Sequence, residues 1–499
     1  MTLLGHRWPA GPAEATVIRT DRSRSHDGAN RALTTAQLAV AVGLAATMVA
    51  LTAFGNGTLA IMCGYAGVLV ALLDPPTGLA VLVLLIPFRE PAGFGPMGFD
   101  LVLGTGILLG CLARLPRDRP LRLELLWAVL LGFGALATIQ VLATPSDFLG
   151  QQMLSATLQL AGLAGGGAVL LAAQHLLRNR DPGPYLDLAV ISGSVVAGLA
   201  IASQVSGGAV QAALSSVYGI GLLQDRAIGT FSNANYFGLF AAMTLLVAIH
   251  RASVGAPWRR ALTAGAAALI SVAVLLSFSR GALLAAAFGV IALAFSRGKR
   301  LGIAAVCACV VTGILLYGSF STARFDVTNP NQSYGAALLA QQSSDESRFV
   351  AGSVGLELFL HDPIFGIGFG QYHFVSPRYV AGSQATYSHD WYVNVLAEQG
   401  LVGISLMALA VILVSARVRR SAPARRGLAV SMLCAYAVGC LFTEAPGQLQ
   451  TSGVAWLVVG AALASTATPA FTRMSIRRSA DQVSHPVMSA ALPTSGRRS

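Results

Sequence analysis

Residues 343–374 (SSDESRFVAGSVGLELFLHDPIFGIGFGQYHF) and 388–403 (SHDWYVNVLAEQGLVG) form a polar segment in a chain that otherwise consists mostly of apolar runs. The segment carries one arginine, three histidines and a run of glycines, and apolar runs at 301–320 and 393–415 flank it. A polar segment between two runs of membrane-spanning length predicts an extramembrane loop. The side of the membrane on which this loop lies therefore decides the orientation of the whole chain.

The composition indicates a polytopic membrane protein. The 499 residues are 55% hydrophobic and 11% charged, whereas soluble domains are about 25% charged, and the mean hydropathy is +0.66. The formal net charge of +12 also occurs in nucleic-acid binders, but arginine enrichment of cytoplasmic loops accounts for it in a membrane protein. We therefore expect membrane lipid, and no nucleic acid, around this chain.

Apolar runs of about twenty residues predict membrane-spanning helices, because that length crosses a hydrocarbon core of about 30 Å. Fourteen runs approach this length, at about 35–53, 57–73, 77–88, 100–113, 124–143, 152–177, 185–204, 234–249, 261–277, 281–295, 301–320, 393–415, 428–443 and 449–467. The third and fourth are short and could be re-entrant or tilted. We expect an all-α fold with 12–14 transmembrane helices.

The positive-inside rule predicts the orientation. With a cytoplasmic N-terminus, all but six of the 33 lysines and arginines fall in inside segments. The expected order is a cytoplasmic tail (1–34), transmembrane helices (35–320), an extracytoplasmic catalytic loop (321–392), transmembrane helices (393–467) and a disordered cytoplasmic tail (468–499). An anionic ligand explains arginines on the outer side, with lipid phosphate or a nearby carboxylate as the alternative. The six outside are Arg89, Arg226, Arg280, Arg324, Arg348 and Arg378.

The six cysteines all lie in apolar runs, so we expect small core side chains there and neither a disulfide framework nor metal ligands. No small-residue cleavage site follows the first apolar run, and this favours a retained helix over a removed signal peptide. The sequence predicts no cofactor and no metal.

The first candidate site is the polar segment 225–236, DRAIGTFSNANY. Ser232, Asn233 and Asn235 are suited to capping the helix that follows. The same helix N-terminus, with Arg226 close in sequence, can also bind an anion. Both interpretations stay open for this segment.

The second candidate site is the break at 276–282, LSFSRGA, where two predicted spans meet without room for a long loop. Arg280 is expected at the outer membrane boundary, with Ser279 capping the next helix and Gly281 allowing close backbone approach. Arginine suits phosphate because its planar fork donates paired hydrogen bonds. The alternative is an arginine that reaches lipid headgroups.

The third candidate site is the loop itself. Ser343 and Glu346 have capping-box spacing, which predicts a helix that starts there and ends before Pro363. Arg348 would then lie in the first turns, where the helix dipole favours anions. The glycines of 363–370 lack the context of a dinucleotide fingerprint and indicate a tight turn with close backbone packing.

His389 is the candidate general base, because histidine accepts protons near neutral pH. It lies in YSHDWY at 387–392, directly before a predicted span. A purely interfacial histidine is the alternative, and His361 and His373 compete for the same role.

Together these segments resemble the O-antigen ligase and polymerase family, which are integral membrane glycosyltransferases. The similarity covers about residues 220–415 and depends on the order and spacing of its motifs. The matching pieces are GTFSNANYFG at 229–238, SFSRGALLA at 277–285, Arg348 with HDPIFGIGFGQY at 361–372, and SHDWYVNVLAEQGLVG at 388–403.

The resemblance implies a metal-independent enzyme that transfers glycans from an undecaprenyl-diphosphate carrier to a glycan or glycolipid acceptor outside the cytoplasmic membrane. It implies that Arg280 and Arg348 bind the diphosphate and that His389 deprotonates the acceptor hydroxyl. Arg226 would be a further anion contact. Asp390 departs from the asparagine that commonly follows the histidine, so it either raises the basicity of His389 or binds the acceptor.

Two other classes compete with the enzyme. A transporter or flippase of anionic or lipid-linked substrates tends to show internal repeats and polar residues at mid-membrane on interrupted helices, and we find no convincing repeat. A structural scaffold would leave the outside arginines unexplained. Convergence of Arg280, Arg348 and His389 in one cavity would favour the enzyme, and separation by more than about 20 Å would oppose it.

Overall fold

The computed structural model describes residues 33–54, 56–88, 99–113, 124–143, 151–178, 180–218, 226–323, 334–379 and 388–465. Within these residues the regular structure is helical throughout and contains no strand, which confirms the all-α prediction. Apart from residues 33 and 34, the expected tails lie outside the described residues, as do Arg89 and Arg324.

A helix lies at each of the fourteen predicted spans. These helices are α1 (Thr35–Ala53), α2 (Gly57–Leu73), α3 (Pro75–Leu85), α4 (Phe99–Leu112), α5 (Leu125–Leu142), α6 (Gln151–Leu176), α7 (Gly183–Val205), α9 (Ala234–Ala252), α10 (Pro257–Leu276), α11 (Arg280–Arg297), α12 (Lys299–Ala323), α15 (Trp391–Arg420), α16 (Pro423–Cys440) and α17 (Leu449–Ala464). In the described part of the chain, α1, α5, α6, α7, α10, α11 and α15 are long and apolar enough to cross a membrane. The fold is therefore that of a polytopic membrane protein.

Helix α3 is too short to cross a bilayer alone. Its 11 residues extend over about 16 Å, roughly half of the hydrocarbon core. All of them are buried, and α1, α2, α4 and α7 pack around the helix. Protein therefore encloses α3, which suits the re-entrant or tilted alternative for this run.

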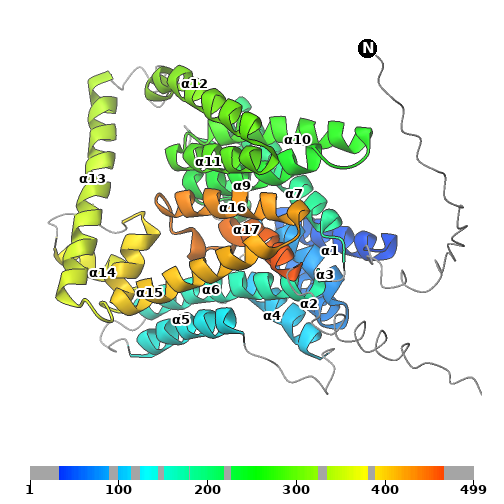
Figure 1. Cartoon of the computed structure of the whole chain (residues 1–499), viewed down its shortest axis with the longest axis horizontal. Coiled ribbons are helices and arrows are strands. Elements are labelled where there is room, and N and C mark those ends of the chain that lie inside the picture. The colour runs from blue at the N-terminus through cyan, green and yellow to red at the C-terminus, as the bar shows by residue number, and fades with distance from the viewer. Residues whose placement is uncertain are drawn as a thin grey trace, which may run out of the picture.

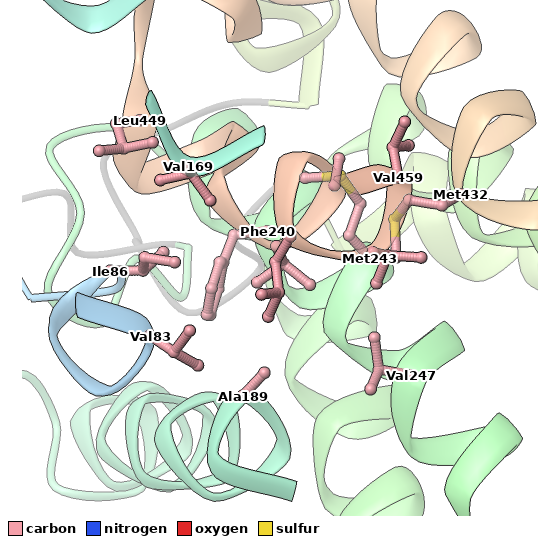
Figure 2. Close-up of a cluster of buried hydrophobic side chains, with 14 of the residues drawn as sticks. Val83, Ile86, Val169, Ala189, Phe240, Met243, Val247, Met432, Leu449 and Val459 are labelled. Carbon is pink, nitrogen blue, oxygen red and sulfur yellow. The ribbon is translucent and has the colours of Figure 1, made fainter. Parts of the chain in front are cut away.

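Helix α9 forms the centre of the helical core. Its residues from Phe237 to Ala248 are all buried, as expected for a helix that is apolar on every side. Figure 2 shows Phe240, Met243 and Val247 of this helix among side chains of α3, α6, α7, α16 and α17. Close packing of this kind leaves the polar segments at the ends of the helices.

The predicted loop forms a helical layer of its own. Helix α13 (Tyr334–His361) lies at one end of the molecule, across the direction of most other helices, at the left of Figure 1. The short α14 (Tyr372–Val375) and the 3-10 turn η2 (Ser376–Arg378) follow it and lead towards α15. Elsewhere, the short α8 (Ala209–Tyr218) and the 3-10 turn η4 (Ala445–Gly447) join longer helices.

The predicted start of the loop helix is wrong. Helix α13 begins at Tyr334, so Ser343 lies inside the helix and is not its N-cap. The residues ahead of Ser343 are mostly alanine, leucine and glutamine, which propagate a helix well. Arg348 consequently lies several turns from the helix N-terminus, and the helix dipole adds little to its attraction for anions.

The glycine-rich turn packs against a break in α15. The backbone N–H groups of Ile367 and Gly368 donate to the carbonyl oxygens of Ala397 and Glu398, at 3.0 and 2.9 Å. Helix α15 loses helical geometry at Gly400, with φ 61° and ψ −155°, and the turn bonds the carbonyl groups just before this break. The prediction of a tight turn with close backbone packing is confirmed.

Candidate functional site

Four of the predicted site residues line one cavity of about 610 Å³, which we call the first cavity. Arg280 comes from α11, Arg348 from α13, and His389 and Asp390 from the segment before α15. The elements that supply these residues are far apart in the sequence. The remaining wall is largely apolar and includes Leu284, Phe349, Leu356, Val393, Leu441 and Phe442.

Arg280 is presented by a sharp corner between α10 and α11. Phe278 adopts φ 46°, a left-handed conformation that is strained for a bulky side chain. Ser279 caps α11 by accepting from the N–H of Ala282 at 3.3 Å. An added Cβ at Gly281 would lie 2.5 Å from Cβ of Phe442, so only glycine lets α11 approach the cavity wall this closely. The predicted capping and close approach are both present.

Arg226 and Asn235 lie behind this corner. Arg226 donates from Nε to the carbonyl oxygen of Ser277 at 2.8 Å and from Nη2 to Oδ1 of Asn235 at 2.9 Å. The N–H of Ala227 donates to the carbonyl oxygen of Leu276 at 2.9 Å. Neither Arg226 nor Asn235 is among the residues that line the first cavity or the second cavity described below.

His389 has the other strained backbone of the described non-glycine residues, with φ 55°. Asp390 follows it and caps α15, because its carboxylate accepts from the N–H groups of Tyr392 at 2.8 Å and Val393 at 3.3 Å. Strain in such a position persists only where neighbouring contacts enforce it and often marks a functional site. The cap of α15 holds the backbone that presents the imidazole.

The surroundings of His389 favour its neutral form. Burial lowers the pKa of His389, and the positive charge of Arg348 lowers it further. A neutral imidazole has a nitrogen that accepts a proton, as a general base requires. Burial raises the pKa of the neighbouring Asp390, although its bonds to Val393 and Tyr392 oppose that shift.

His389 also lines a second cavity of about 480 Å³, and so lies where the two cavities meet. The second cavity contains Asn233, which caps α9 by accepting from the N–H of Asn235 at 2.7 Å. Glu444 and Trp391 line it as well. Of the predicted substrate-binding residues, Asn233 is thus the one that faces this side of His389.

Glu444 is a site residue that the sequence analysis missed. It lies between α16 and α17, and Nδ2 of Asn394 donates to its Oε1 at 2.9 Å. Burial raises the pKa of Glu444 to about 7, although the bond from Asn394 opposes the shift. The sequence did hold a signal, since a carboxyl group in a short gap between two apolar spans is costly and usually functional.

The two competing histidines lie elsewhere. His361 is exposed, and its Nδ1 lies 2.9 Å from Oδ2 of Asp362. His373 stacks on Phe374, with ring centroids 4.1 Å apart. Neither lines the two cavities, so of the three candidate bases only His389 lies beside the arginines.

A family model described as O-antigen ligase matches residues 265–408. This range contains Arg280, Arg348, His389 and Asp390, and it runs from α10 into α15. The resemblance seen in the sequence is confirmed over this part of the chain, and the match supports an enzyme of the ligase or polymerase type. A search of curated proteins finds no match.

Proposed function

We propose that this chain, which carries an O-antigen ligase segment at residues 265–408, is a glycosyltransferase that moves a glycan from a polyprenyl-diphosphate carrier to a sugar hydroxyl. One observation carries the proposal. Arg280, Arg348 and His389, from separate elements, line a single cavity. Two cations and a proton acceptor in one cavity suit the departure of an anionic group and the activation of a hydroxyl.

The first cavity suits the donor. Its two guanidinium groups can pair with the phosphate oxygens of a diphosphate, each through two parallel hydrogen bonds. Its apolar wall, with Leu284 on α11 and Leu441 directly after α16, suits the start of a polyprenyl chain. In the reaction, negative charge grows on the departing diphosphate, and cations fixed in place beforehand stabilise that charge without reorganising.

His389 acts as the base in this proposal. The acceptor oxygen passes its proton to the imidazole and forms a bond to the anomeric carbon, while the bond from that carbon to the diphosphate breaks. The polyprenyl diphosphate leaves with the electron pair and stays paired with Arg280 and Arg348. The lowered pKa of His389 supports this role, because the imidazole is then neutral at the start of the step.

Arg226 and Asn235 support the site from behind it, and Asp390 supports it from the cavity wall. The bonds of Arg226 to Ser277 and Asn235 hold the corner that presents Arg280. The bonds of Asp390 hold the start of α15 beside His389. The arginines supply the positive charge that a metal ion supplies in other glycosyl transfers, so we propose a metal-independent reaction.

We further propose that the site faces away from the cytoplasm, in the cytoplasmic membrane. Segments predicted to be cytoplasmic are joined to one another, as in the bond from Arg297 Nη2 to Oγ of Ser253 at 2.6 Å. Arg425 likewise donates from Nη2 to the carbonyl oxygen of Arg180 at 3.3 Å. The arginine-poor segments gather instead around His389, and this separation supports the orientation that the positive-inside rule predicts.

A transporter or flippase remains the alternative, and one feature favours it: α15 is interrupted at Gly400, as transporter helices often are at a binding site. The convergence of Arg280, Arg348 and His389 favours the enzyme, because a flippase needs no proton acceptor between its cations. The acceptor can be a lipid-core or cell-wall sugar, as in a ligase, or another lipid-linked repeat unit, as in a polymerase.

Reconstituted protein given a polyprenyl-diphosphate-linked oligosaccharide and an envelope glycan fraction from the source cells tests the proposal. His389→Ala and Arg280→Ala should each lower transfer at least a hundredfold. His361→Ala and Arg378→Ala, which change the same residue types outside the cavity, should stay within about twofold. Full transfer by His389→Ala and Arg280→Ala would rule out the assignment. Movement of the intact donor across the bilayer without transfer would identify a flippase.

A further inference from the structure

The second cavity shares His389 with the first cavity but is lined by different helices, among them α6 and α9. Its volume of about 480 Å³ lies within the range of roughly 300–1,000 Å³ that is usual for small-molecule sites. Among the described residues, His389 is the one that lines both cavities. A ligand in the second cavity would therefore lie next to His389 without occupying the cavity of the donor.

The two cavities differ in the charge of the residues that line them. Arg280 and Arg348 both line the first cavity, whereas the described residues that line the second include no arginine or lysine and include one carboxyl group, that of Glu444. A diphosphate in the second cavity would meet no cation from these residues and would be near an acid. The charges thus exclude the donor's anionic group from the second cavity and favour an uncharged ligand.

The polar groups of the second cavity suit hydroxyl groups. Gln159, Ser232, Asn233 and Gln448 bring amide and hydroxyl groups that both donate and accept hydrogen bonds. A ligand with several hydroxyl groups can satisfy both kinds of partner, whereas an apolar ligand would leave the polar groups unpaired.

Two aromatic side chains also line the second cavity. Trp391 is 5% exposed, and Tyr236 lines the cavity from the first turn of α9. Flat rings give a ligand a large contact area at low cost in entropy, and they pack against the C–H faces of a sugar ring. Aromatic faces together with hydroxyl-binding groups are a combination that suits a carbohydrate.

Hydrogen bonds tie Glu444 to the segment that carries the base. Asn394 donates from Nδ2 to Oε1 of Glu444 at 2.9 Å, and its Oδ1 accepts from Oγ of Ser388 at 2.6 Å. Ser388 directly precedes His389. A hydroxyl bonded to Glu444 is therefore held at a fixed place relative to the imidazole, and such positioning lowers the barrier for proton removal.

We propose that the second cavity is the acceptor subsite, that it binds an uncharged sugar unit, and that Glu444 binds a hydroxyl of that sugar. The inference rests on the proposed function, because it assumes that His389 activates an acceptor. It adds a place and a chemical class for the acceptor: the reacting sugar carries no phosphate or carboxylate at the position that enters the cavity. Donor and acceptor thus approach His389 from different cavities.

Kinetics with the full chain in nanodiscs test the inference. A synthetic polyprenyl-diphosphate-linked oligosaccharide serves as donor, and the envelope glycan fraction of the source cells is titrated as acceptor. Glu444→Gln should raise the half-saturating acceptor concentration at least tenfold and leave the donor KM within about twofold.

A pair of cavity-filling variants gives the same test without changing an ionisable group. Ser155→Trp fills the second cavity from α6, and Ser353→Trp fills the first cavity from α13. Ser155→Trp should raise only the half-saturating acceptor concentration, and Ser353→Trp should raise only the donor KM. Glu357→Gln, an exposed carboxyl on α13 that lines neither cavity, is the matched control and should change neither.

The outcomes separate the two proposals. If wild-type protein transfers no glycan and hydrolyses no donor, the proposed function fails. If wild-type protein transfers glycan but Glu444→Gln and Ser155→Trp raise the donor KM, or change neither constant, the acceptor subsite is wrong while the enzyme stands. An unchanged donor KM in a variant shows that its first cavity is intact, so a misfolded variant cannot be mistaken for an acceptor defect.

Discussion

Arg226 donates from Nε to the carbonyl oxygen of Ser277 at 2.8 Å, three residues before Arg280 in the chain. Arg226, which the sequence analysis predicted as an anion contact, is thus hydrogen-bonded to the corner between α10 and α11 that presents Arg280. Its bond to Asn235 joins the corner to the start of α9. These bonds would offset the cost of an arginine at the membrane boundary, where the sequence predicts Arg226.

Replacing Arg226 should weaken the site without removing it. Arg226→Gln leaves the partly buried carbonyl of Ser277 without its charged donor, which costs about 1.5–3 kcal/mol of stability. The donor KM should rise several-fold because Arg280 is held less firmly, while kcat changes less than in Arg280→Ala. Thermal unfolding and steady-state kinetics of Arg226→Gln and Arg378→Gln check this. A donor KM unchanged from wild type would contradict the positioning role.

The pH profile should report the neutral form of His389. The base must be unprotonated, so kcat/KM should rise with pH through the pKa of His389 and then level off. Burial and Arg348 lower that pKa from its ordinary value of 6.5, so the midpoint should lie below pH 6.5. Glu444→Gln is the suitable background for the measurement, because burial raises the pKa of Glu444 to about 7 and its titration would add an inflection to the profile.

Removing the charge of Arg348 should move this midpoint in a known direction. The positive guanidinium disfavours the imidazolium, so Arg348→Gln should raise the pKa of His389 and shift the profile to higher pH. The absolute rate should also fall, because a donor contact is lost, but the midpoint is independent of that loss. A midpoint that stays fixed would show that Arg348 does not act on His389.

Local patterns in the sequence predicted much of the fold. Apolar runs located fourteen helices, and Ser279 and Gly281 have the capping and close-packing roles that their residue types suggest. The start of α13 was wrong because Ser343 and Glu346 fit a capping box while the residues ahead of them also favour a helix. Sequence spacing alone does not decide between a cap and a continuing helix.

Local sequence patterns did not predict contacts between residues that are far apart in the sequence. Asn235 is a plausible cap by residue type, yet the cap of α9 is Asn233, and Asn235 accepts from Arg226. Glu444 was overlooked because its importance depends on α16 and α17 bringing it beside His389. These relations arise from packing between helices, which residue types and their periodicity do not encode.

A methyl group at Gly281 should disturb the first cavity. The added Cβ would lie 2.5 Å from Cβ of Phe442, so α11 or the cavity wall must move, at a cost of about 1–3 kcal/mol. Gly281→Ala should lower thermal stability and raise the donor KM. Gly265→Ala in α10, where an added Cβ meets nothing within 4 Å, should be neutral or up to about 1 kcal/mol more stable. Equal behaviour of the two variants would show that the packing at Phe442 is unimportant.

Chelators should leave transfer unchanged. In the proposed reaction Arg280 and Arg348 carry the positive charge that stabilises the departing diphosphate, so no step requires a divalent ion. Transfer should stay within about twofold when EDTA is added to protein previously washed with it. Loss of activity that returns when Mg²⁺ or Mn²⁺ is added would show that a metal shares this task.

Gly400 should be the least replaceable glycine of α15. Its φ of 61° and ψ of −155° lie in a region that is essentially restricted to glycine, at a cost of about 1–3 kcal/mol for other residues, and an added Cβ would lie 2.5 Å from the carbonyl oxygen of Ile364. The glycine-rich turn that follows α13 bonds to α15 at this break, so Gly400→Ala should loosen the helix that carries Arg348. We expect a lower unfolding temperature and a raised donor KM, whereas Gly134→Ala, with nothing within 4 Å of the added Cβ, should show neither. A destabilised Gly400→Ala protein with an unchanged donor KM would mean that α13 is held in place by other contacts, such as its packing along α15.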